Sequence, residues 1–183
     1  SFGGRVAMAA AADAAAGSEF CVRRLCVTGV AADRGALGRL AIQGWRASLR
    51  HGDLESFVWQ LILATHSPAY LSAQEKNVPA WVSAVVEANS VEGLRSIVEQ
   101  THTDDPADAS HPLALAAAIK ARSTVEEALV IGGTEDVVAP AAEARRLADE
   151  AGWRYTEISG TAHAIPIEQA VTWRREVLSF LDA

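Results

Sequence analysis

The chain has 183 residues, 50% of them hydrophobic, and a formal net charge of −7 from 23 acidic and 16 basic side chains. This length is typical of one domain with a sizeable core, and the acidic balance without a Lys or Arg run excludes the electrostatic pattern of nucleic-acid or anionic-membrane binding. No stretch reaches the roughly 18 unbroken apolar residues of a membrane span. We therefore expect a soluble, globular protein that binds neither nucleic acid nor membrane.

Residues 1–36 are predicted to form a core segment with a helix followed by a buried strand. Residues 3–16 are rich in alanine, lack proline and precede Gly17, a natural helix stop. Residues 21–28 are apolar and β-branched and precede a glycine, as in a buried parallel strand. Cys21 and Cys26 would point to opposite faces of that strand, so we expect no disulfide and favour a cytoplasmic location.

Residues 37–110 are predicted to form a helical cap. Apolar side chains recur there at helical spacing in four groups, and residues suited to helix ends separate the groups. A polar hinge over residues 101–112 then returns the chain to the core. The four groups are Leu40, Trp45 and Leu49; Leu54, Phe57, Val58 and Leu61; Trp81, Val82, Val85 and Val86; and Leu94, Ile97 and Val98.

Residues 111–183 are predicted to complete the core, with strands at 128–132 and 153–158. Pro140 and Gly152 stand at the start and just past the end of one helix, where these residue types are favoured. Strands that alternate with helices predict an α/β fold with a parallel, doubly wound sheet. The expected helices are residues 113–119, 140–151 and 167–181, the last with Val171, Val177, Leu178 and Leu181 on one face.

Three short segments carry the predicted chemistry. Ser1-Phe2-Gly3-Gly4 opens a helix and matches the last positions of a nucleophile elbow, G-x-S-x-G. Gly132-Gly133-Thr134-Glu135-Asp136 and Gly160-Thr161-Ala162-His163 follow predicted strands, which places them at the carboxyl edge of a parallel sheet. A serine nucleophile needs a base, and the base needs a carboxylate to hold its tautomer. These segments therefore supply a candidate triad of Ser1, His163 and Asp136.

The order Ser, Asp, His makes the chain resemble the α/β-hydrolase superfamily, in particular its capped branch of enol-lactonases, esterases and C–C bond hydrolases. The resemblance covers this chain but only about half of the family's fold. It implies that the Phe2 amide donates to the oxyanion and that a companion N-terminal fragment supplies the first strands and a second donor. It also implies a small ester, lactone or thioester as substrate, with no cofactor.

Several assignments stay open at this point. Glu135 is the alternative to Asp136, which could instead form an ordinary Asx turn. Trp45, Trp59 and Trp81 could line a substrate pocket or pack in the core. Acyl transfer, or ligand binding without catalysis, would use the same site. We expect no metal, because the one cluster with ligand-like residues lacks ligand spacing; it consists of His102, Asp104, Asp105 and His111.

The position of Ser1 as the first residue has three explanations. Cleavage before the serine and an incomplete sequence record both fit, and the residues do not separate them. In the third, the α-amine of Ser1 is the base of an N-terminal-nucleophile amidase. Such enzymes have an antiparallel sandwich, whereas this chain predicts a parallel sheet, so the hydrolase interpretation is favoured.

Overall fold

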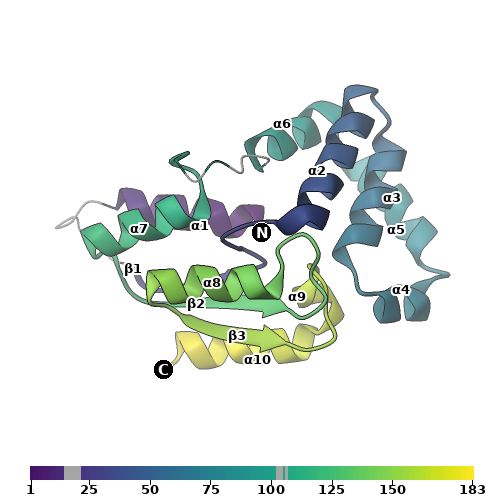
Figure 1. Ribbon diagram of the computed structural model, residues 1–183. Coiled ribbons are helices and arrows are strands. Elements are labelled where there is room, and N and C mark those ends of the chain that lie inside the picture. Colours follow the sequence, from purple (N-terminus) through teal and green to yellow (C-terminus); the bar gives the residue numbers. More distant parts are fainter. Residues whose placement is uncertain (15–21, 102–104, 106) are drawn as a thin grey trace.

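A computed structural model of the chain describes residues 1–14, 22–101, 105 and 107–183. The strands β1 (Val22–Thr28), β2 (Val125–Gly133) and β3 (Arg154–Ile158) form a parallel sheet in the order β1-β2-β3 (Figure 1). Each crossover between strands passes through at least one helix, as parallel pairing requires. The predicted parallel α/β architecture is confirmed.

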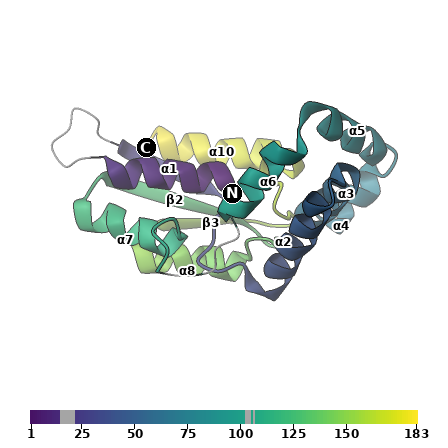
Figure 2. The same cartoon turned by 90° about the horizontal axis from the view of Figure 1, so that it is seen from above.

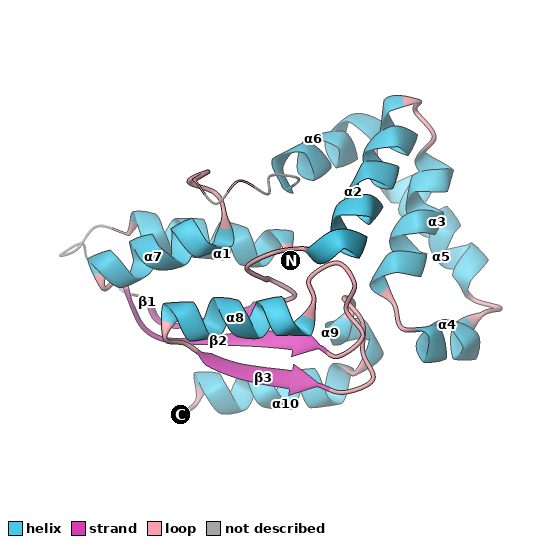
Figure 3. Ribbon diagram, viewed as in Figure 1, coloured by secondary structure: helices cyan, strands magenta, loops and turns pink. Residues whose placement is uncertain are grey.

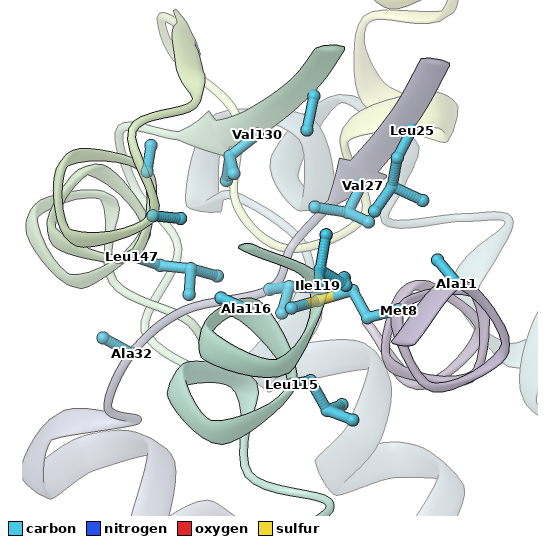
Figure 4. Close-up of a cluster of buried hydrophobic side chains, with 14 of the residues drawn as sticks. Met8, Ala11, Leu25, Val27, Ala32, Leu115, Ala116, Ile119, Val130 and Leu147 are labelled. Carbon is cyan, nitrogen blue, oxygen red and sulfur yellow. The ribbon is translucent and has the colours of Figure 1, made fainter. Parts of the chain in front are cut away.

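Helices cover both faces of this sheet. Neighbouring residues of a strand point to opposite sides, and apolar side chains of β2 point to both. In β2, Val130 packs with Met8, Ile119 and Leu147 on one face (Figure 4), whereas Ile131 packs on the other. The β2 strand is therefore buried on both sides, as its run of apolar residues predicts. The first face is covered by α1 (Phe2–Asp13), α7 (Pro112–Arg122) and α8 (Ala141–Ala151), and the second by α9 (Ile165–Glu168) and α10 (Ala170–Leu181).

Five consecutive helices form a separate layer beside the sheet, which we call the helical module (Figures 1 and 2). The module has a core in which Leu49, Phe57 and Val58 are almost fully buried, and Val138 from the loop after the second strand packs into it. Asp53 and Ser67 begin two of the helices by accepting backbone N–H groups with their side chains. The helices are α2 (Gly35–Arg50), α3 (Leu54–Thr65), α4 (Pro68–Gln74), α5 (Val78–Ala88) and α6 (Val91–Thr101).

The closing helix differs from the prediction. The structure divides it into α9 and α10, because Gln169 between them has φ −131° and ψ 51°, outside the helical region. The predicted apolar face was also wrong: Val171 is 83% exposed, and Leu178 and Leu181 are more than 40% exposed. Phe180 is the buried anchor instead, and Val177 packs against the same cluster.

Other boundaries differ from the prediction by a few residues. The first strand begins at Val22, and Cys21 and Gly17 lie outside the described residues. The second strand is longer than expected at both ends, and α4 was not predicted as a separate helix. Burial raises the pKa of the Cys26 thiol to about 11, so this side chain stays protonated at neutral pH. None of the described helices is long and apolar enough to cross a membrane.

The packing predicts how two leucines differ in their contribution to stability. Leu147 on α8 is fully buried in the core of Figure 4. Leu147→Ala should lower the free energy of unfolding by about 2–5 kcal/mol, because it leaves a cavity. Leu178→Ala is the control, since that side chain is 44% exposed, and should change the stability much less. Urea unfolding followed by circular dichroism measures both; equal losses would contradict the assigned core.

Candidate active site

The three strands end at one edge of the sheet, and the loops that follow them form the candidate site. Thr28, Gly133 and Ile158 are the last residues of β1, β2 and β3. Figure 3 shows the arrowheads of β2 and β3 directed toward the same group of loops, on the side of the helical module. Parallel α/β sheets bind ligands at this edge.

Asp136 is held firmly in the loop after β2. Its side chain is fully buried, and its Oδ1 accepts the backbone N–H groups of Val138 at 2.8 Å and Ala139 at 2.7 Å. Its Oδ2 contacts Nδ1 of His163 at 2.7 Å. The carboxylate thus makes the Asx-type turn and the imidazole contact at once. Because Oδ1 is occupied by backbone donors, Oδ2 is directed at the ring.

Hydrogen bonds join the acid loop to the histidine loop. The Glu135 N–H donates to Thr161 O at 2.8 Å, and the Gly160 N–H donates to Thr134 Oγ1 at 2.8 Å. The loops approach so closely at Gly133 that a Cβ there would lie 2.5 Å from Ala162 O. Glycine at this position is therefore a steric requirement of the contact between the loops.

Ser1 and His163 border the same turn at the end of β1. The Ser1 α-amine donates to Thr28 O at 2.5 Å. Gly29, with φ +64°, lies against the His163 ring, so that a Cβ would be 3.0 Å from Cε1. Among the described residues, no hydrogen bond joins the Ser1 hydroxyl to His163.

A pocket lies beside Ser1. The turn after β1 and the loop after β2 both line it, through Gly29 and Ala139 respectively. Two arginines, Arg5 and Arg34, also contribute to its wall. The pocket places open space next to Ser1, whereas His163 and Asp136 are not among the residues that line it.

The structure separates the two candidate acids. Glu135 is exposed, whereas Asp136 is buried against His163. The loop geometry explains the difference, because the Glu135 N–H is committed to Thr161 O and its side chain is directed outward. Phe2 follows Ser1 as the first residue of α1, at a helix N-terminus where free N–H groups are available.

The three tryptophans have different surroundings. Trp45 is buried in the helical module with its ring edge-on to Phe57, and Trp59 packs against the same core. Trp81 stacks with His66 and Tyr70, with its ring centroid 6.1 Å from each, and those two rings stack on each other at 5.6 Å. Trp81 is thus the tryptophan that belongs to an aromatic group near the histidine loop, since Thr65 O, next to His66, accepts the Ala164 N–H.

Sequence reasoning missed two residues beside the site. Gly29 follows β1 and has a positive φ. A glycine directly after a predicted strand is the sequence signal that could have identified it. Glu168 accepts the backbone N–H of Ala162 at 3.0 Å and that of Ser67 at 3.1 Å. Nothing local in the sequence distinguishes Glu168 from a solvated acid.

The polar hinge contributes no described metal centre. No group of three or more His, Cys, Asp or Glu side chains able to hold a metal occurs in the described part of the chain. His102 and Asp104 lie outside it. His111 is buried at the start of α7, where its Nδ1 accepts the Leu113 N–H at 3.3 Å.

Comparison with solved structures identifies the fold. The chain matches an α/β hydrolase enzyme from a Medee basin deep-sea metagenome library, with a TM-score of 0.80 and 19% identity over 100% of this chain and 63% of that one. It matches the enol-lactonase of Burkholderia xenovorans with a TM-score of 0.74 and 25% identity over 100% and 64%. It matches a thermophilic esterase from Thermogutta terrifontis with a TM-score of 0.66 and 16% identity, over 98% of this chain and 61% of the esterase.

The chain therefore has the α/β-hydrolase fold, as the sequence predicted. It spans less than two thirds of the length of these structures. No protein-family model matches the sequence, and no curated protein matches it either. The identification of the fold thus depends on three-dimensional similarity, while the site is defined by the contacts described above.

The close approach of the two loops predicts the effect of a methyl group at Gly133. Gly133→Ala should destabilise the protein by about 1–3 kcal/mol, because the added Cβ meets backbone oxygens that cannot move aside alone. A crystal structure of the variant should show the Asp136 to His163 contact lengthened beyond 2.7 Å. Gly93→Ala is the control, since its Cβ would meet only the movable Ser90 side chain. An unchanged contact and stability would contradict the steric argument.

Proposed function

We propose that the protein is a serine hydrolase that acts on a small ester, lactone or thioester through Ser1, His163 and Asp136. The observation that carries the proposal is the contact of 2.7 Å between Asp136 Oδ2 and His163 Nδ1 at the carboxyl edge of a parallel sheet. The similarity to solved esterases and an enol-lactonase supports the same class. The triad, the acyl-enzyme and the substrate are all parts of this proposal.

The proposed reaction follows from the direction of the imidazole contact. With Nδ1–H donating to Asp136, Nε2 is the free acceptor that takes the proton of Ser1 Oγ as this oxygen attacks the carbonyl carbon. The carbonyl oxygen becomes negative and accepts the Phe2 N–H. His163 then protonates the leaving alcohol or thiol, and an acyl-enzyme forms on Ser1. Water, deprotonated by His163, releases the acid and restores the serine.

The proposal extends to parts that this chain does not supply. A second oxyanion donor and the strands that complete the sheet are expected from a companion N-terminal fragment. The exposed side chain of Val6 on α1, together with the unpaired edge of β1 among the described strands, is compatible with such a fragment. Acyl transfer to a nucleophile other than water would use the same steps up to the acyl-enzyme.

Removal of the serine hydroxyl tests the nucleophile. Ser1→Ala should lower turnover of an activated ester about a million-fold, as in related triads, and should abolish covalent labelling by a fluorophosphonate. Ser159→Ala is the control, because that exposed serine lies in the loop after β3. Intact mass and steady-state kinetics are the measurements. Turnover of Ser1→Ala within tenfold of the parent would exclude Ser1 as the nucleophile.

The two neighbouring acids provide a matched pair of variants. Asp136→Asn should lower turnover about ten-thousand-fold, because the amide no longer holds the imidazole in the productive tautomer. Glu135→Gln should change turnover little, since Glu135 is exposed. Each variant side chain has nearly the volume of the acid that it replaces. The kcat values of the two variants, measured at a temperature where both are folded, can therefore be compared directly. If Glu135→Gln rather than Asp136→Asn lost turnover, Glu135 would be the acid of the triad.

A further inference from the structure

Glu168 connects the histidine loop to a residue that lies 101 positions before Glu168 in the sequence. Its Oε1 accepts the N–H of Ala162, which immediately precedes His163, at 3.0 Å. Its Oε2 accepts the N–H of Ser67, at the junction of α3 and α4 in the helical module, at 3.1 Å. One half-buried carboxylate therefore joins the histidine loop to the helical module.

A second contact runs parallel to this one. The Ala164 N–H, on the other side of His163, donates to Thr65 O at 2.7 Å. The backbone on both sides of His163 is thus linked to the junction of α3 and α4, through Glu168 on one side and by a direct hydrogen bond on the other. That junction is itself supported, because His66 stacks with Tyr70 and Trp81.

We propose that Glu168 is a positioning residue that holds the His163 loop against the helical module, so that the imidazole keeps its contact with Asp136. The inference rests on the proposed function. A carboxylate suits this role because both of its oxygens accept, and both partners are N–H donors. Glutamine would offer one acceptor and one NH₂ group, and the NH₂ group would face a backbone donor.

Glu168→Gln should therefore lower kcat about 10- to 100-fold, the cost of a misplacement of about 1 Å in a catalytic group, while KM changes less than about threefold. Kinetics should be measured at a temperature where circular dichroism shows the variant folded, so that lost stability alone leaves kcat unchanged. Glu176→Gln is the control, because that acid on α10 pairs with Arg175 at the surface. A Glu168→Gln kcat within twofold of the parent would overturn the inference.

Ser67 gives an independent test of the same bond. Ser67→Pro removes the donating N–H while its φ of −68° suits proline, and the preceding His66 is extended, as a residue before proline should be. Ser67→Ala keeps the N–H and loses only the side-chain cap of α4. The proline variant should lower kcat more than the alanine variant. Combining Ser67→Pro with Glu168→Gln should cost less than the product of the single effects, because both act on one bond.

Hydrogen exchange separates this inference from the proposed reaction. In protein carrying Ser1→Ala, which the proposed mechanism makes inactive, Glu168→Gln should still accelerate exchange of the Ala162 and Ala164 amides at least tenfold over the rest of the sheet. Unchanged exchange at both amides would overturn the positioning role. If exchange accelerates but the parent is not labelled by fluorophosphonate at Ser1, the contact stands as a tether of the loop and the proposed hydrolase function fails.

Discussion

Parallel pairing of the three strands is the constraint on which the site depends. It brings the ends of β2 and β3 to one edge, so that Asp136 and His163 touch although 27 residues separate them in the sequence. The end of β1 adds the turn at Thr28 and Gly29 to the same edge. An antiparallel arrangement would send these strand ends in opposite directions, and the contact could not form.

Close backbone approach converts that shared edge into a defined geometry. Gly133 lets the acid loop reach the backbone oxygens of the histidine loop, and Gly29 lets the turn after β1 lie flat against the imidazole. The N–H groups of Val138 and Ala139 fix one carboxylate oxygen of Asp136. Backbone groups of the acid loop thus hold the carboxylate in place, the condition under which a catalytic group keeps its position without reorganisation.

The helical module meets the site at two places, the acid loop after β2 and the junction of α3 and α4. Its interior is a hydrophobic core that also contains Val138 from the loop after β2, so the module shares its packing with the acid loop. The contacts of Thr65 O with Ala164 and of Ser67 with Glu168 bring that junction to the histidine loop. A change in the module's position would therefore reach His163 through its neighbouring peptide groups, and would reach Asp136 through Val138.

The sequence by itself determined the alternation of strands and helices, because side-chain periodicity is a local property, and it predicted Ser1, Asp136 and His163 as a candidate triad. The tertiary structure showed that Asp136, which the sequence favoured over Glu135, contacts the imidazole, and it alone decided that Phe180 rather than Val171 is buried. It also decided that Glu168 joins two distant loops. The physical reason is that the direction of a loop side chain, and the face of a helix that is covered, depend on which distant segments pack there.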